Sequence, residues 1–469
     1  MGTTAELAAF TAQIRLADIP SDVAARAKSL LLDLLGNIIR ARHDAESTPS
    51  LIAAARVMGV AAGNNVVFGD SARYTPAGAA LLNAALGHSL DFDDTHAAGS
   101  LHPGCPVIPA ALAAGEVTGA SGADILAAIV AGYEVTCRVA LALPAGDHYA
   151  RGFHPTATCG VFGAAAAAAR VFGLDPATTE SALGIALSQS AGSLQFLANG
   201  AWTKRFQVGW ASMSGLAAAA LAREGFKGAA EALEGKHGFL NAYAPNPNPA
   251  RATENLGRDW ELMRTAVKPY PSCRYGHAGI DAAIAWHALA LDGGIHDPAT
   301  IERVTYGTST SGMTLIGDPL AQRQNPQNVV DGQFSGPFVI ACGLLTGEMT
   351  WDSYARLQDP AIRALLPRIA IAHDAEVQAE FPTNMAGKLT IVANGQTWQR
   401  LVRIPKGEPE NFLSDADLRA KFMTLAAPVL GEDRTARLAD LTLKLDESPT
   451  LNALTRLAAP TLSARLAGD

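Results

Sequence analysis

Aromatic residues are scarce in this chain. They make up 6% of its 469 residues, although 49% of all residues are apolar. Alanine, leucine and valine therefore supply most of the apolar content, which favours close-packed helices over β-sandwiches built from aromatic and β-branched side chains. A chain of this length holds one or two domains with a substantial core.

Cysteine is also sparse, and its five copies form no CxxC pair. An odd number of scattered cysteines argues against a disulfide framework and against a zinc ribbon, and it fits a reducing compartment. The five are Cys105, Cys137, Cys159, Cys273 and Cys342.

Basic residues are not in excess, because 36 Lys and Arg stand against 44 Asp and Glu, for a net charge of -8. Without a basic stripe, the sequence carries no electrostatic footprint for nucleic acid. The start, MGTTAELAAF, lacks the basic stretch and long apolar run of a signal peptide. The longest uncharged run, 182–203, is broken by Ser, Gln, Asn and Gly, so it is poor transmembrane material. We therefore expect a cytoplasmic protein with no nucleic-acid or membrane partner.

Helical periodicity dominates both ends of the chain. Pro20 should end the first helix and Ser21 should cap the second, while Ser121 begins a Ser-x-x-Asp pattern that resembles a capping box. Segment 154–170 contains two glycines and six consecutive alanines, which predicts a buried central helix. The other helices are predicted over 5–18, 21–43, 48–59, 76–89, 106–118, 121–143, 178–192 and 210–223.

The pattern becomes more β-like after residue 266. Residues 301–309 alternate as a strand does, and 389–404 reads as two strands around Asn394-Gly395, a strong hairpin signal. Helices return after Ser414. We predict a mainly α fold in which both ends of the chain form one large helical domain and an α+β lid domain is inserted. The predicted boundaries are 1–265 and 406–469 for the helical domain and 266–405 for the lid.

The segment HSLDFDDTHAAGSLHPGCP, residues 88–106, is the densest in groups that can move protons or hold a metal. It lies between two predicted apolar helices, where polar groups are costly unless they are paired or used. It contains three carboxylates, three imidazoles and the hydroxyl of a threonine, namely Asp91, Asp93, Asp94, His88, His96, His102 and Thr95.

Three further places carry candidate residues. His154 comes just before a predicted helix, where an imidazole can point into a cleft. Lysines at helix starts are usually solvated, but Lys204 stands between Trp202 and Phe206 in a stretch that otherwise favours burial. The segment VKPYPSCRYGH gathers several polar side chains before a helix, namely Lys268, Ser272, Arg274, Tyr275 and His277.

Several of these candidate residues also have a purely structural explanation. Asp93 and Asp94 are as well explained by capping the next helix or by pairing with lysines. His96 fits a solvated loop residue, and His88 fits the core or a supporting position behind the site. Cys159 fits a buried small apolar residue better than a nucleophile.

Four motifs, in this order and at these intervals, give the chain its resemblance to a known family. They are LDFDDTH with LHPG, GFHPTATCGVFGAAAAAAR, WTKRFQVGWAS and VKPYPSCRYGH. Together with SLLLDLLGNII and DGQFSGPFVIA, they resemble the MmgE/PrpD family over nearly the whole chain. That family includes 2-methylcitrate dehydratase, cis-aconitate decarboxylase and iminodisuccinate epimerase. The resemblance implies a homodimer, no organic cofactor and a small anionic carboxylate substrate.

Carried over by position, the resemblance implies a catalytic cleft and a carbanion or enolate-like intermediate beside a carboxylate. We assign proton transfer to His102 with Asp91 as its orienter, a second acid or base to His154, and carboxylate binding to the two lysines. Arg274, Ser272 and His277 are added as substrate-binding groups. The implied catalytic residues are Asp91, Thr95, His102, His154, Lys204 and Lys268.

Three reactions stay open. Dehydration of a 2-hydroxy tricarboxylate, as in 2-methylcitrate dehydratase, is placed first, cis-aconitate decarboxylation second and iminodisuccinate epimerisation third. Asp-x-Asp-Asp-x-His could instead hold Mg²⁺ as in terpene cyclases, but the chain shows few aromatics and no second acidic cluster, so no metal is expected. A non-catalytic binding protein is the remaining alternative.

Overall fold

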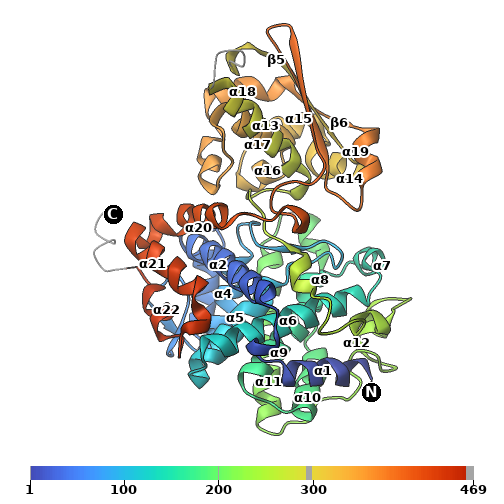
Figure 1. Cartoon of the computed structure of the whole chain (residues 1–469), viewed down its shortest axis with the longest axis vertical. Coiled ribbons are helices and arrows are strands. Elements are labelled where there is room, and N and C mark those ends of the chain that lie inside the picture. The colour runs from blue at the N-terminus through green and yellow to red at the C-terminus, as the bar shows by residue number, and fades with distance from the viewer. Residues whose placement is uncertain (1, 199, 292–297, 461–469) are drawn as a thin grey trace. The chain divides into compact units, whose positions relative to one another are not determined.

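The computed structural model describes residues 2–198, 200–291 and 298–460. Its contacts divide the chain into two compact units, residues 1–267 with 415–469, and residues 268–414. The first unit is built from both ends of the chain and the second is inserted between them, so the predicted mainly α fold is confirmed (Figure 1). Within the described ranges, none of the helices combines the length and the apolar character needed to cross a bilayer.

In its described residues, the first unit consists of helices, loops and two short strand pairs. These pairs are β1 (Asn65–Val66) with β2 (Arg73–Tyr74), and β3 (Thr95–His96) with β4 (Thr265–Ala266). Its helices are α1 (Thr3–Gln13), α2 (Ser21–Asp44), α3 (Thr48–Val57), α4 (Pro76–Gly87), α5 (Gly104–Thr118), α6 (Gly122–Leu141), α7 (Ala145–Ala150), α8 (Pro155–Thr158), α9 (Gly160–Val171), α10 (Pro176–Leu187), α11 (Thr203–Arg223), α12 (Phe239–Tyr243), α20 (Asp415–Leu430), α21 (Glu432–Leu443) and α22 (Asn452–Leu457).

The alanine-rich helix α9 is the centre of this unit, as predicted. All six of its consecutive alanines are fully buried, and the helix packs against α5, α6 and α11 (Figure 1). The approach to α6 is so close that a Cβ on Gly163 would lie 1.7 Å from Thr136 Oγ1. Small side chains therefore allow four helices to meet closely and hold the segments between them in place.

Several local predictions can be compared with the helix ends. Ser121 caps α6 by accepting a hydrogen bond from the Asp124 amide, as its capping pattern predicts. Ser21 was expected to cap α2, but the helix begins at Ser21 and Pro20 occupies the cap position without a side-chain bond. Helix α11 begins at Thr203 rather than at residue 210, so Lys204 lies in its first turn.

The second unit packs helices against one face of a four-stranded sheet in the order β6-β5-β7-β8 (Figure 1). β5 and β6 are parallel, whereas β7 pairs antiparallel with β5 and β8. The predicted hairpin is confirmed, with Asn394 and Gly395 both at positive φ in its turn. The elements are α13 (His277–Leu291), β5 (Ile301–Thr308), α14 (Thr310–Gly312), α15 (Leu320–Arg323), α16 (Val329–Gln333), α17 (Gly336–Thr346), α18 (Pro360–Leu365), β6 (Ile369–His373), α19 (Ala375–Glu380), β7 (Gly387–Ala393) and β8 (Gln396–Val402).

Candidate active site

The polar segment predicted as the site connects the end of α4 to the start of α5. His88 is the C-cap residue of α4, and the chain then forms β3 before Gly104 begins α5. Most of the segment's polar side chains are buried in the first unit. Because buried polar groups need partners, the contacts inside this segment decide what it can do.

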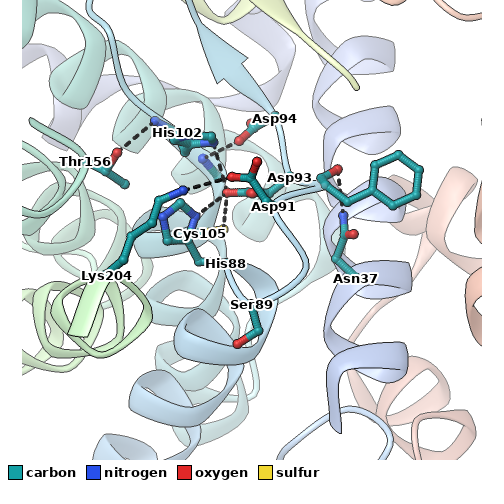
Figure 2. A network of polar contacts seen from close by, with 12 residues as sticks. Asn37, His88, Ser89, Asp91, Asp93, Asp94, His102, Cys105, Thr156 and Lys204 are labelled. Atoms are coloured by element: carbon teal, nitrogen blue, oxygen red, sulfur yellow. Dashed lines mark hydrogen bonds and ion pairs between the residues drawn. The ribbon is translucent and has the colours of Figure 1, made fainter. Parts of the chain in front are cut away.

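Asp93 is the centre of the network (Figure 2). Its Oδ2 lies 2.7 Å from His88 Nδ1 and 3.2 Å from His102 Nδ1, and it accepts a hydrogen bond from Cys105 Sγ at 3.0 Å. Burial opposes its charge, but the two imidazoles outweigh that cost and hold the pKa of the Asp93 carboxyl well below its usual range. The carboxylate therefore stays ionised. Its hydrogen bond fixes the His88 ring with the Nδ1 proton toward it, whereas His102 Nδ1 lies at ion-pair distance from the same oxygen.

The two imidazoles differ in their access to solvent. The side chain of His88 is fully buried, whereas that of His102 is 16% exposed. Burial lowers the pKa of His88 to about 4, despite the attraction of Asp93, so this ring is neutral near pH 7. His102 is held from its backbone as well, because its amide donates to Thr156 Oγ1 at 3.2 Å. Of the pair, His102 is the imidazole that a substrate can reach.

A second ion pair lies beside this network. Lys204 Nζ is 2.8 Å from Asp91 Oδ1, and the two side chains are 26% and 17% exposed (Figure 2). Burial disfavours the ammonium, but attraction to Asp91 and Asp93 outweighs it and raises the pKa of Lys204 above its usual value. A permanently charged lysine at the accessible edge of the network can bind a carboxylate.

His154 precedes α8, as predicted, and its ring stacks on that of His88 at a centroid distance of 5.9 Å. Its Nδ1 lies 3.3 Å from the side-chain oxygen of Gln207, so Nδ1 carries the proton and Nε2 is the acceptor. Burial is the main cause that holds the pKa of His154 well below its usual range, and the nearby Lys204 ammonium adds to it. His154 is thus suited to accept a proton or a hydrogen bond rather than to act as a cationic acid.

Two residues of the segment, His96 and Asp93, differ from their structural interpretation, and a third, Asp94, agrees with it. His96 was expected in solvent, but it is buried and its Nε2 lies 3.0 Å from Glu261. Asp93 neither caps a helix nor pairs with a lysine, whereas Asp94 does accept from the amide of Gly104, the first residue of α5. Burial raises the pKa of Asp94 to about 7, against the hydrogen bond from Tyr133.

The assignment of Asp91 as the orienter of His102 needs correction. Asp91 contacts Lys204, and the carboxylate beside His102 Nδ1 belongs to Asp93. Thr95 lies on β3, and its hydroxyl oxygen is buried without a hydrogen-bond partner among the residues that the structure describes. That hydroxyl keeps the capacity to bond a substrate oxygen.

The remaining candidates belong to the second unit. Lys268 is buried, and so is Ser272, whose hydroxyl has no hydrogen-bond partner in the described part of the chain. His277 starts α13 and its Nε2 lies 3.2 Å from the carbonyl oxygen of Ser272. Arg274, expected to grip a substrate carboxylate, binds both carboxylate oxygens of Glu408 at 2.6 and 2.5 Å. A substrate would have to displace Glu408 to use that guanidinium.

His88, Asp93 and Cys105 place three potential metal-ligand atoms within 4.8 Å of one another. Hydrogen bonds explain this proximity without an ion, because the imidazole and the thiol both donate to the same carboxylate. Burial also raises the pKa of the Cys105 thiol well above its usual value, so it is not the thiolate that a metal prefers. The donor set therefore fits a hydrogen-bonded cluster better than a metal centre.

The comparisons with known proteins cover almost the whole chain. Residues 5–252 match the MmgE/PrpD N-terminal domain, and residues 270–447 match the MmgE/PrpD C-terminal domain. The cis-aconitate decarboxylase-like protein oryM of Aspergillus oryzae is 31% identical over 97% of this chain and 96% of its own length. A cis-aconitate decarboxylase of Aspergillus terreus is 28% identical over 97% and 96%. The cis-aconitate decarboxylase of Mus musculus is 29% identical over 82% and 79%.

Proposed function

The chain belongs to the MmgE/PrpD family, and from this premise we propose that it is a lyase that decarboxylates cis-aconitate or a closely related unsaturated tricarboxylate. One structural observation carries the proposal. An accessible imidazole, that of His102, is backed by the buried carboxylate of Asp93 beside the Lys204–Asp91 ion pair. Together these groups offer a proton donor and a cation for an anionic substrate.

The relatives support decarboxylation better than the dehydration placed first from the sequence. These relatives are cis-aconitate decarboxylases or a protein like them, and the two from Aspergillus match over 97% of this chain. Dehydration and epimerisation remain the alternatives, because both also need anion binding and proton transfer beside a carboxylate.

The proposed reaction needs one proton and no redox partner. Loss of CO₂ from the methylene carboxylate breaks a carbon–carbon bond, and its electron pair forms the new double bond. The former double-bond pair moves to the neighbouring carbon, which becomes enolate-like beside its own carboxylate. His102, protonated and held by Asp93, delivers a proton to that carbon, so the trianion and one proton yield the itaconate dianion and CO₂.

The other residues are given supporting roles. Lys204 binds a substrate carboxylate and stabilises the developing charge, and Asp91 holds the lysine. Neutral His154 keeps its proposed role as a second proton-transfer group, with Nε2 as its basic atom. Thr95 offers its hydroxyl to a substrate oxygen. The second unit's Lys268, Ser272, Arg274 and His277 stay proposed substrate-binding residues on the family resemblance alone.

Proton NMR in D₂O tests the reaction type. Purified protein is mixed separately with cis-aconitate, 2-methylcitrate, citrate and an iminodisuccinate stereoisomer. The proposal predicts itaconate from cis-aconitate, with one deuterium on its saturated methylene carbon. New vinylic signals from a hydroxy acid would instead establish a dehydratase, and deuterium with a changed diastereomer ratio would establish an epimerase.

We further propose that two copies of the chain associate through α11. One side of this helix carries large exposed rings, with Trp202 44%, Phe206 40% and Trp210 38% exposed. At 100° per residue, this side continues through Met213, Ala217 and Leu221 within an arc of about 100° and a length of about 29 Å. Exposed apolar stripes of this size, rich in Trp and Phe, are typical of interfaces.

The stripe complements itself, which favours a second copy as its partner. Its first half is bulky and its second half is smaller, with Ala217 and Ala220 between larger side chains. A two-fold axis that pairs two α11 helices antiparallel sets the rings of one copy on the small side chains of the other. Size-exclusion chromatography with light scattering should show a dimer for the wild type and a monomer for Trp210→Glu. Val57→Glu, at an exposed apolar residue on α3, is the matched control and should stay dimeric.

A cytoplasmic location is proposed as well. All five cysteines are free and buried. Cysteines that pair with none of their neighbours are typical of proteins that work in a reducing compartment.

A further inference from the structure

Asp91 occupies a backbone conformation that needs support. Its φ is +53°, in the left-handed region that residues other than glycine rarely adopt. Such a conformation costs free energy and persists only where surrounding contacts hold it. The same residue places its carboxylate on Lys204, so the contacts that hold the turn also set the geometry of that ion pair.

The strongest anchor of the turn is the carbonyl of the next residue, Phe92. Lys421 Nζ donates to this oxygen at 2.8 Å, and Asn37 Nδ2 donates to it at 3.3 Å (Figure 2 shows the Asn37 contact). The same ammonium lies 3.7 Å from the centroid of the Phe92 ring. Phe92 is therefore held by both its backbone and its side chain.

Asp33 of α2 holds the ammonium in turn. Its Oδ1 lies 2.5 Å from Lys421 Nζ, and both side chains are buried. Phe92 stands between Asp91, which binds Lys204, and Asp93, which binds the imidazoles. One anchored residue thus fixes the backbone between the two carboxylates of the site.

We propose that Lys421, held by Asp33, is a positioning residue of the active site. This inference rests on the proposed function, because it presupposes that Asp91 and Asp93 belong to the active site. Lys421 itself is assigned no contact with substrate. Lys421 lies on α20, which follows the inserted unit and is 329 residues from Phe92 in sequence. Helix α20 therefore does more than cover the core. Through Lys421 it holds residues 88–96 in the conformation that places the carboxylates of Asp91 and Asp93.

Stability alone does not account for this arrangement. Replacing a buried ion pair by apolar residues of similar size is often neutral or stabilising, because the two charges need no desolvation. A pair that only stabilised the fold could thus be exchanged without harm to the site. A pair that positions Phe92 could not, because misplacing catalytic groups by about 1 Å costs up to about 100-fold in rate.

The test uses the double variant Asp33→Leu/Lys421→Met of the full chain, which removes both charges of the pair. Arg26, a buried neighbour that Asp33 also attracts, keeps its hydrogen bond to the carbonyl oxygen of Thr265. Amide hydrogen exchange by mass spectrometry reads the mobility of residues 88–96, and thermal unfolding reads global stability. We expect exchange in 88–96 to rise about tenfold or more at an unchanged unfolding temperature. With cis-aconitate, kcat should fall about 10- to 100-fold.

Two further variants keep the test decisive. Asn37→Ala removes the other donor to the Phe92 carbonyl and should change exchange and kcat in the same direction by less. The control is Arg42→Met/Asp70→Asn, which removes another ion pair anchored on α2 and should leave residues 88–96 and kcat unchanged.

Each outcome decides something. Unchanged exchange in 88–96 for a folded Asp33→Leu/Lys421→Met protein overturns the anchor, and faster exchange with unchanged kcat overturns the positioning role. Faster exchange in a protein whose wild type turns over no polycarboxylate upholds the anchor and overturns the proposed function instead.

Discussion

Replacing Asp93 by Asn should abolish most of the activity while preserving the fold. The carboxylate accepts from Nδ1 of His88, which fixes that tautomer, and it places a negative charge 3.2 Å from Nδ1 of His102. An amide in the same place carries no charge, and its NH₂ group can face Nδ1, which would then have to accept. With Nδ1 as the acceptor, His102 would be neutral with its proton on Nε2. It would then lack the charge beside it that helps the ring to take up and release the proton during turnover.

The expected loss in kcat follows from what one general acid–base group contributes. Such a group supplies about 10² to 10⁴ in rate, which corresponds to about 3–5 kcal/mol of transition-state stabilisation at 1.36 kcal/mol per factor of ten. Asp93→Asn should therefore lower kcat by about 10²- to 10⁴-fold, with a smaller change in KM because Asp91 and Lys204 are untouched.

Asp94→Asn is the matched control, since this neighbouring carboxyl is equally buried but lies against Tyr133 and Gly104. Its pKa of about 7 means that an uncharged side chain already occurs there near neutral pH, so kcat should change less than about threefold. Steady-state kinetics on the substrate found by NMR compares the two variants. Equal effects, or an Asp93→Asn enzyme within threefold of wild type, would refute the assignment.

Three further outcomes are expected. His88 has a folded pKa of about 4 against 6.5 for the free side chain, so the unfolded chain binds more protons between these values. The free energy of unfolding should therefore rise with pH across that window by up to about 3 kcal/mol, and by less in His88→Asn. Denaturant titrations at several pH values measure both. An equal dependence on pH in wild type and His88→Asn would contradict the buried neutral ring. Lys204→Met should raise KM about tenfold or more, because the substrate carboxylate loses its cation; an unchanged KM would remove Lys204 from substrate binding. Wild-type kcat/KM should show no lysine titration below pH 10, because the pKa of Lys204 is raised. Turnover should survive dialysis against EDTA, because hydrogen bonds account for the cluster around Cys105, and its loss on chelation would restore the metal interpretation.

Structural features that depend on residues close together in sequence were predictable. The cap at Ser121, the hairpin at Asn394-Gly395 and the buried alanine helix each depend on neighbours a few residues away. The polar segment was also recognisable, because three carboxylates and three imidazoles between apolar helices are costly without a use.

Pairings between distant segments were not predictable from the same signals. His96 looked solvated because its partner, Glu261, lies 165 residues away. The choice between Asp91 and Asp93 beside His102 depends on the positive φ at Asp91, which no local propensity indicated. Lys421 gave no signal at all, since its role follows only from the return of α20 to the first unit.

The most direct test of the account is the turnover of His102→Ala on cis-aconitate, measured by itaconate formation in D₂O with the wild type alongside. His102 is the accessible imidazole backed by Asp93, so the variant should fold normally and lose about 10²- to 10⁴-fold in kcat. A folded His102→Ala enzyme that forms itaconate at a rate within threefold of wild type would contradict the account, because the proton would then have to come from another group.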